Sequence, residues 1–445
     1  MRGERRVVIT GLGTVTPLGI GIEPLWEALM ARRSGIRPID AFDASGLMTR
    51  LGGQVPPFKT ADYVPKTYRK SVKVMARDIE IAVVAAYVAV KDARLKTRCM
   101  IERGEMEGPT NVDPARFGAN IGAGLICADL PELAGALYTA AKDGRFSLAR
   151  WGTEGMANLT PLWLLKFLPN MLGCHVTIVH DAQAPSNTIT CGEASSHLAI
   201  GEAFRTIARG DAEVCICGGA ESKVNPMGVL RQQLLNRLVT GCDDRPDGAC
   251  RPFSASRGGM VVSESGGLII LEALDHALAR SARIYGEIIG FGASANTYSW
   301  SDPDPEGTCI AAAASTAMDD AGVSAEAIDL VGTVGTGTRE HDASELKGLR
   351  LALGGRFDGM AAIATKGSLG NSGAGSGAVD VAVCAMAMFH STVPPSLNTE
   401  DPDPLCGLGF VTGDAVDRPI RCFLSVGYAL GGGQNAALVV RKFEE

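Results

Sequence analysis

The sequence predicts an α/β fold made of two duplicated halves, and three patterns support this prediction. Short apolar strands alternate with long apolar helices, as in VVITGLG (residues 7–13) and DIEIAVVAAYVAVKDARL (78–95). Many of the 55 glycines stand where apolar strands end. Similar segments also recur about half a chain apart. Strands that alternate with helices favour parallel sheets covered on both faces.

The recurring segments define the two halves. The helix at 78–95 and the strand FGANIGAGL (117–125) are echoed by CIAAAASTAMDDAGV (309–323) and IDLVGTVGTGT (328–338). Likewise, 197–221 is echoed by 377–395, and SGGLIILEAL (265–274) by GGGQNAALVV (431–440). Such internal similarity indicates duplication. We place the boundary near residue 265, with halves at 1–264 and 265–445.

Composition excludes several classes of function. The chain is 46% hydrophobic and 20% charged with a net charge of −7, which argues against a nucleic-acid partner. No unbroken apolar run approaches the ~18 residues that insert in a membrane, and a charged start leads directly into a strand without a signal peptide. We therefore expect a cytoplasmic protein. The 12 cysteines lack CxxC pairs and the six histidines lack ligand spacing, so we expect neither a metal nor another cofactor.

The segment NTITCGEASSH (187–197) has the pattern of a nucleophile site. A β-rich run leads into a sharp turn, and small residues then open a helix. Two side chains compete for the exposed tip of the turn, the thiol of Cys191 and the carboxyl group of Glu193.

Ordered blocks along almost the whole chain resemble the β-ketoacyl-acyl-carrier-protein synthases, the condensing enzymes of fatty-acid and polyketide synthesis. They include VVITGLGTVTPLG, GDAEVCICGGAE, RPFSASRGG, VGTGTREHDASE, TKGSLGNSGAGSGAVD and GGGQN. The resemblance implies a five-layer αβαβα thiolase-like sandwich. It also implies a nucleophilic cysteine at the turn, where a helix N-terminus favours the thiolate. Counting back from GDAEVCICGGAE places that position on Glu193, so we expect Cys191 to pack within the preceding strand.

The resemblance also locates the family's other site residues, and several have changed. The two catalytic histidine positions hold Val334 and Asn371, whereas Lys366 matches the family's lysine. The C-terminal loop reads LGGGQN, where glycine replaces an aromatic gate; its glycines are Gly431, Gly432 and Gly433, the first at the gate. A carboxylate cannot form a thioester and valine has no donor, so we expect no condensation by the family's mechanism.

Three interpretations remain open. The chain resembles chain-length factors, which would make it a non-condensing partner of an active ketosynthase in a heterodimer, or else a homodimer. Its second partner would be an acyl carrier protein; carriers are acidic, so we expect a basic surface near the pocket. Alternatively, Glu193 could support malonyl-carrier decarboxylation or another acyl transfer, either protonated through burial or as a general base.

The third interpretation is structural and is compatible with the first. Glu193 would form a buried ion pair with Lys366 and thereby fix the geometry of an inactive site. Two histidines lie near these segments. We expect His197 to be a core residue, whereas His341 could replace a lost histidine.

Overall fold

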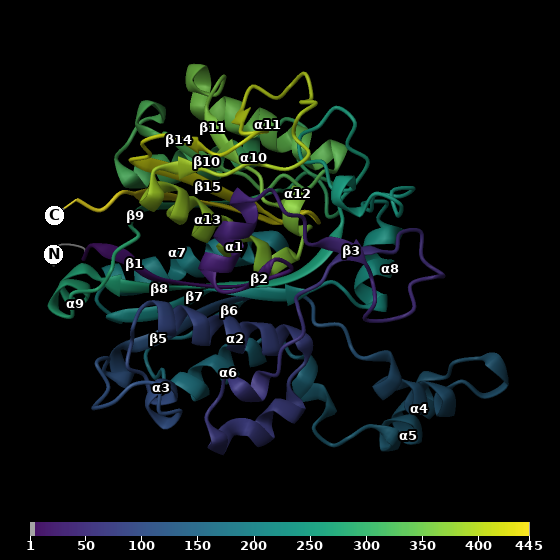
Figure 1. Ribbon diagram of the computed structural model, residues 1–445. Coiled ribbons are helices and arrows are strands. Elements are labelled where there is room, and N and C mark those ends of the chain that lie inside the picture. Colours follow the sequence, from purple (N-terminus) through teal and green to yellow (C-terminus); the bar gives the residue numbers. More distant parts are fainter. Residues whose placement is uncertain (1–4, 445) are drawn as a thin grey trace.

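Two β-sheets, each covered by helices on both faces, form five layers in the computed structural model, which describes residues 5–444 (Figure 1). Residues 1–4, which include part of the charged start, lie outside the described residues. The two sheets meet at one corner, where β1 (Val7–Thr16) pairs with β9 (Gly286–Ala295) over a few residues.

Both halves build their sheets in the same spatial order. The N-terminal sheet runs β6 (Asn187–Ile189), β5 (Phe117–Ala123), β7 (Val214–Ser222), β8 (Val262–Ala273), β1. The C-terminal sheet runs β11 (Ala361–Ile363), β10 (Leu330–Gly332), β15 (Cys422–Tyr428), β16 (Gln434–Arg441), β9. In each half the first three of these strands are parallel and the next two pair antiparallel. Two of the three echoes in the sequence therefore correspond to matching strands, β5 with β10 and β8 with β16. The echo of 197–221 in 377–395 matches a helix in each half, but its strand falls on β12 (Thr392–Val393), which pairs outside both sheets, and not on β15.

Helices complete the layers (Figure 1). One outer layer holds α2 (Arg77–Asp92) and α6 (Met171–His180), and the other holds α10 (Thr308–Ala321) and α11 (Arg339–Leu353). Between the sheets lie α7 (Ser195–Ala208) and α13 (Ser376–His390). The predicted αβαβα sandwich of two similar halves is confirmed. The predicted boundary near residue 265 falls within β8, and the division at that residue stays a prediction.

Glycines explain the close packing of strand and helix in each half. A Cβ on Gly13 of β1 would lie 2.2 Å from the carbonyl oxygen of Ala85 in α2. A Cβ on Gly292 of β9 would lie 2.2 Å from that of Ala313 in α10. Only glycine permits this close approach of strand and helix, so a glycine lets the outer helix pack directly against the strand in both halves.

One helical stretch among the described residues, Gly373–His390, has the length and hydropathy of a membrane span, and 89% of it is buried inside the fold. The sequence analysis found no unbroken apolar run of this length because Ser376 and Asp380 interrupt it. Its burial between the two sheets identifies it as the central core helix.

The remaining elements are short and lie mostly at the edges of the layers. The helices are α1 (Ile22–Met30), α3 (Arg98–Glu102), α4 (Leu130–Ala140), α5 (Leu148–Thr153), α8 (Pro226–Leu234), α9 (Leu274–Ala279) and α12 (Lys366–Leu369). The strands are β2 (Gly19–Ile20), β3 (Ile36–Pro38), β4 (Leu51–Gly53), β12 (Thr392–Val393), β13 (Gly409–Phe410) and β14 (Val416–Asp417).

Candidate functional site

Glu193 lies at a strand-to-helix turn between β6 and α7. The strand ends at Ile189, a single 3₁₀ turn covers Gly192–Ala194, and α7 begins at Ser195. Gly192 has a φ of +56°, which lets the chain reverse sharply. The turn places the Glu193 side chain inside the protein, where the residue is only 5% exposed.

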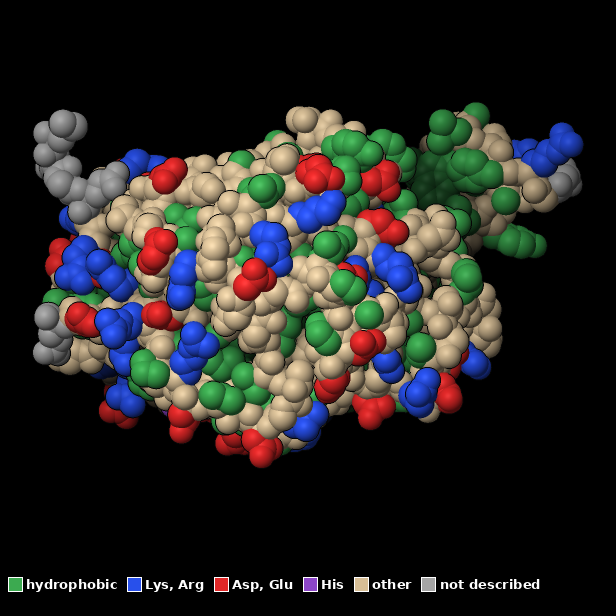
Figure 2. All heavy atoms as spheres, turned by 90° about the horizontal axis from the view of Figure 1, so that it is seen from above, with side chains coloured by type: hydrophobic (Ala, Val, Ile, Leu, Met, Phe, Trp, Pro, Cys, Tyr) green, Lys and Arg blue, Asp and Glu red, His purple; other side chains and the backbone are tan. Residues whose placement is uncertain are grey.

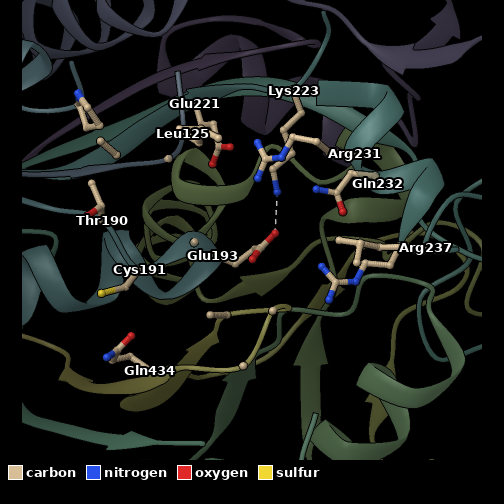
Figure 3. Close-up of a pocket in the computed structure, with 18 of the residues that line it drawn as sticks. Leu125, Thr190, Cys191, Glu193, Glu221, Lys223, Arg231, Gln232, Arg237 and Gln434 are labelled. Atoms are coloured by element: carbon tan, nitrogen blue, oxygen red, sulfur yellow. Dashed lines mark hydrogen bonds and ion pairs between the residues drawn. The ribbon is translucent and has the colours of Figure 1, made fainter. Parts of the chain in front are cut away.

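Three groups hold the Glu193 carboxylate. Lys223, which directly follows β7, places its Nζ 2.6 Å from Oε1 (Figure 3). Asn371 Nδ2 donates to the same oxygen at 3.2 Å, and the backbone N–H of Leu430 donates to Oε2 at 3.1 Å. Two of the sequence-predicted positions, Glu193 and Asn371, are thus brought into contact.

The expected ion pair between Glu193 and Lys366 is wrong. Lys366 Nζ instead bonds the carboxylate of Asp380 in α13, and both side chains are almost fully buried. Thr365 Oγ1 donates to the other oxygen of Asp380 at 2.6 Å. Because Asp380 already neutralises Lys366, Lys223 is the lysine available to Glu193.

The electrostatics of the site keep Glu193 ionised. Burial alone would raise the pKa of Glu193, but the charge and hydrogen bond of Lys223 and the Leu430 amide outweigh it and lower the pKa to about 2. This lowered pKa argues against the protonated Glu193 considered from the sequence. A second buried carboxyl group, Glu221, has its pKa raised by burial and accepts from the Ala374 N–H at 2.7 Å. Burial would lower the pKa of Lys223, but the charges of Glu193 and Glu221 outweigh burial and raise it.

Val334 contributes no polar group to the site. It is buried in an apolar cluster with Met260, Tyr428 and Leu430, and it does not line the pocket described below. Its backbone N–H donates to Glu345 Oε1 at 2.7 Å, which fixes the VGTGT turn in place.

His197 and His341 both form hydrogen bonds with groups other than Glu193. His197 is fully buried, as expected, and its Nε2 lies 2.8 Å from Ser425 Oγ. His341 Nε2 donates to the Leu430 carbonyl at 2.8 Å, and its Nδ1 lies 3.0 Å from Thr338 Oγ1. Because a carbonyl only accepts, Nε2 carries the proton and Nδ1 is the acceptor. His341 thus braces the Leu430 loop, and it does not line the pocket described below.

The expectation that Cys191 packs within the strand is wrong. The strand ends at Ile189, and the half-buried Cys191 forms part of a pocket wall. Its sulfur points away from the Glu193 carboxylate (Figure 3). Burial raises the pKa of the thiol, so nothing here favours the reactive thiolate.

A pocket of about 550 Å³ opens beside Glu193. Its lining includes Gly431 and Gly432 of the glycine loop, whereas Gly433 lies behind them and its carbonyl accepts from the Asn296 N–H at 2.6 Å. Basic and amide side chains from the segment after β7 also reach the pocket (Figure 3), namely Lys223, Arg231, Gln232 and Arg237.

The sequence led us to expect a basic surface near the pocket but did not identify the residues that form it. Lys223, Arg231 and Arg237 are spread over fifteen positions and form no charged run. The available signal was positional, because Glu221 and Lys223 stand at the carboxyl end of a buried strand, the edge where sites form in α/β folds.

Comparison with known proteins agrees with the fold. The model of the β-ketoacyl synthase N-terminal domain matches residues 4–277, and that of the C-terminal domain matches residues 285–400. The chain is 33% identical to the 3-oxoacyl-[acyl-carrier-protein] synthase 2 of Synechocystis sp., with 99% of each chain covered. It is 32% identical to a putative polyketide β-ketoacyl synthase 1 of Streptomyces halstedii, with 98% of each covered.

Solved structures extend these similarities. The ishigamide ketosynthase/chain length factor superposes with a TM-score of 0.83 at 28% identity, over 99% of this chain and 100% of that one. A β-ketoacyl synthase from Burkholderia phymatum gives a TM-score of 0.84 at 28% identity with the same coverage. The chain belongs to the β-ketoacyl synthase family and has its thiolase-like fold.

Proposed function

We propose that this chain is a non-condensing β-ketoacyl-synthase-like subunit that acts as a chain-length-factor-type partner of an active ketosynthase in fatty-acid or polyketide biosynthesis. The observation that carries the proposal is the buried, ionised Glu193 at the nucleophile turn, paired with Lys223 at 2.6 Å. Condensation needs a thiolate and proton donors at that place. Here the described site offers a bound carboxylate, an apolar Val334 and the amide of Asn371.

The ion pair also counts against a new activity of Glu193. A general base works best when its pKa lies near the working pH, and a carboxylate whose pKa is about 2 is a poor base at pH 7. To attack an acyl group, Glu193 would have to leave both Lys223 and the Leu430 N–H, which already hold its two oxygens.

Two features support a protein partner. Within the described part of the chain, β6 pairs on one side only, with β5, and its other edge is open. Such an edge can accept a strand from another subunit. An arm that contains α4 and α5 projects from the body and carries many apolar side chains (Figures 1 and 2). Its exposed large apolar residues include Leu137, Tyr138, Phe146, Leu148, Met156, Leu162 and Leu164.

The relatives suggest what the partners are. The ishigamide ketosynthase/chain length factor is a structural relative of this chain, and the Synechocystis relative is by its name a synthase that uses acyl carrier protein. We therefore propose a heterodimer with a ketosynthase, in the cytoplasm, with acyl carrier protein as the second partner. A homodimer is the competing arrangement.

The first test is the native mass of the complex purified gently from its own source. We expect a heterodimer with a second β-ketoacyl synthase that retains the cysteine. Adding this chain to that ketosynthase should restore condensation, and Cys→Ala in the partner should abolish it. A homodimer that decarboxylates malonyl carrier, and loses this activity in Glu193→Ala, would overturn the proposal in favour of an enzyme.

A further inference from the structure

The pocket beside Glu193 holds more positive than negative charge. Its lining contains three basic side chains, Lys223, Arg231 and Arg237, but only two acids, Glu193 and Glu221. Lys223 is occupied by Glu193. Among the described residues, neither Arg231 nor Arg237 forms an ion pair with a carboxylate, so two guanidinium groups face the pocket without counterions.

Arg237 is the more unusual of the two because it is buried. The residue is only 8% exposed, and its Nη2 donates to the backbone carbonyls of Ser301 and Leu430, the latter at 2.7 Å. Its Nε and Nη1 donate no hydrogen bond to the described residues. The nearby Asp302 is held by the hydroxyls of Ser299 and Ser301 at 2.9 and 2.8 Å and is not within ion-pair distance.

A buried cation without an anionic counterion carries a desolvation penalty, which an anionic ligand would relieve. Burial lowers the pKa of Arg237, the carboxylates of Glu193 and Asp302 raise it, and the charge of Arg231 lowers it further. Arg231 lines the same pocket as Arg237. In Figure 3 both guanidinium groups and the amide of Gln232 reach from one side toward the space near Glu193.

Gly431 keeps Arg237 open to the pocket. A Cβ built on Gly431 would lie 4.0 Å from both Nη1 and Nη2 of Arg237 and 3.6 Å from the carbonyl oxygen of Trp300. These are ordinary contact distances, and the backbone at Gly431 does not have a positive φ. A Cβ would therefore fit at this position, in contact with the guanidinium group. The glycine leaves that surface bare.

We propose that this pocket contains an oxyanion-binding subsite, in which Arg237 and Arg231, assisted by Gln232, bind a carboxylate or phosphate group. Arg237 supplies the free donors at Nε and Nη1, and the exposed Arg231 on α8 closes on the ligand from the mouth. Guanidinium groups are suited to both anions because their planar donors match two oxygens. The subsite concerns this chain alone and does not depend on the partner proposed above.

The test is calorimetric titration of the purified chain with disodium malonate and with sodium phosphate, at ionic strength held constant by chloride. We expect saturable binding of at least one anion. Arg237→Met should weaken binding by at least tenfold, and Arg231→Met by severalfold. Arg350→Met, which removes an exposed arginine paired with Asp358 elsewhere on the surface, should leave the affinity unchanged.

Gly431→Phe is the second variant, needed in case Arg237→Met fails to fold. It retains every charge and should still weaken binding by at least tenfold, because the ring covers Arg237. Matched ligands then identify the source of the anion. Tighter binding of 4′-phosphopantetheine than of pantetheine would indicate a phosphate, and tighter binding of malonyl-pantetheine than of acetyl-pantetheine would indicate a carboxylate. Absence of saturable binding of both anions, or equal affinity in wild type and Gly431→Phe, would overturn the subsite. Neither result depends on finding a ketosynthase partner.

Discussion

Replacing Lys223 with methionine tests the energetic role of the ion pair at the turn. The side chains of Lys223 and Glu193 are 9% and 6% exposed, so the substitution leaves a buried carboxylate without its counterion. Removing one partner of such a pair typically costs about 3–5 kcal/mol. The lowered pKa of Glu193 points in the same direction, because it means that the folded protein stabilises the ionised carboxylate, with Lys223 as the main cause.

The assay is urea unfolding of the purified variants at pH 7. Lys347→Met is the matched control, since Lys347 pairs with Glu306 at 3.0 Å on the exposed surface, where such pairs contribute about 0–1 kcal/mol. Adding Glu193→Gln to Lys223→Met should recover part of the lost stability by removing the stranded charge. The reasoning is refuted if Lys223→Met costs no more than Lys347→Met, or if the double variant is no more stable than the single one.

Three further predictions follow from the same contacts. Glu193→Cys should yield no 3-ketoacyl product from acyl and malonyl carriers by mass spectrometry, because Val334 still provides no proton donor; any such product would contradict this. The difference in unfolding free energy between wild type and Glu193→Gln should stay constant from pH 7 to about 5 and shrink below 4.5 toward 2. The reason is that a lowered pKa stabilises the fold only while the group is ionised. A difference that disappears above pH 5 in urea unfolding would be inconsistent with this. Lys366→Met should cost about 3–5 kcal/mol because it leaves the buried Asp380 carboxylate without its counterion. Adding Asp380→Asn to Lys366→Met should recover part of this stability, again measured by urea unfolding.

The fold was predictable because duplication leaves a long-range record in the sequence. The strands at 265–274 and 431–440 were matched by pattern alone, and they became β8 and β16, which hold the same place in their sheets. The glycines that seat α2 and α10 also lie at corresponding points. Each such feature is local, and periodicity reports local features well.

The site was only partly predictable because its contacts join distant segments. The turn was recognised because a strand, a glycine and a helix are local features, whereas the choice of Glu193 over Cys191 came from the resemblance to the family. The choice between Lys366 and Lys223 depended on Asp380, which takes the first lysine, and no spacing in the sequence shows that competition. Arg237 was missed for the same reason, because its burial follows from the loops that contain Ser301 and Leu430.

Under the proposed non-condensing function, the buried charges of this site need another role. A buried ion pair is often no more stable than well-packed apolar residues of the same volume, so a site preserved for stability alone could have filled with them. Here a pocket of about 550 Å³ persists, and Lys223 bonds one of the two buried acids beside it. Through Glu193 and the Leu430 N–H, that network also fixes the loop leading to Gly431, and His341 and Arg237 hold the Leu430 carbonyl from the other side. We infer that the charges maintain the shape of an open pocket, which a subunit that shapes or binds an acyl ligand requires.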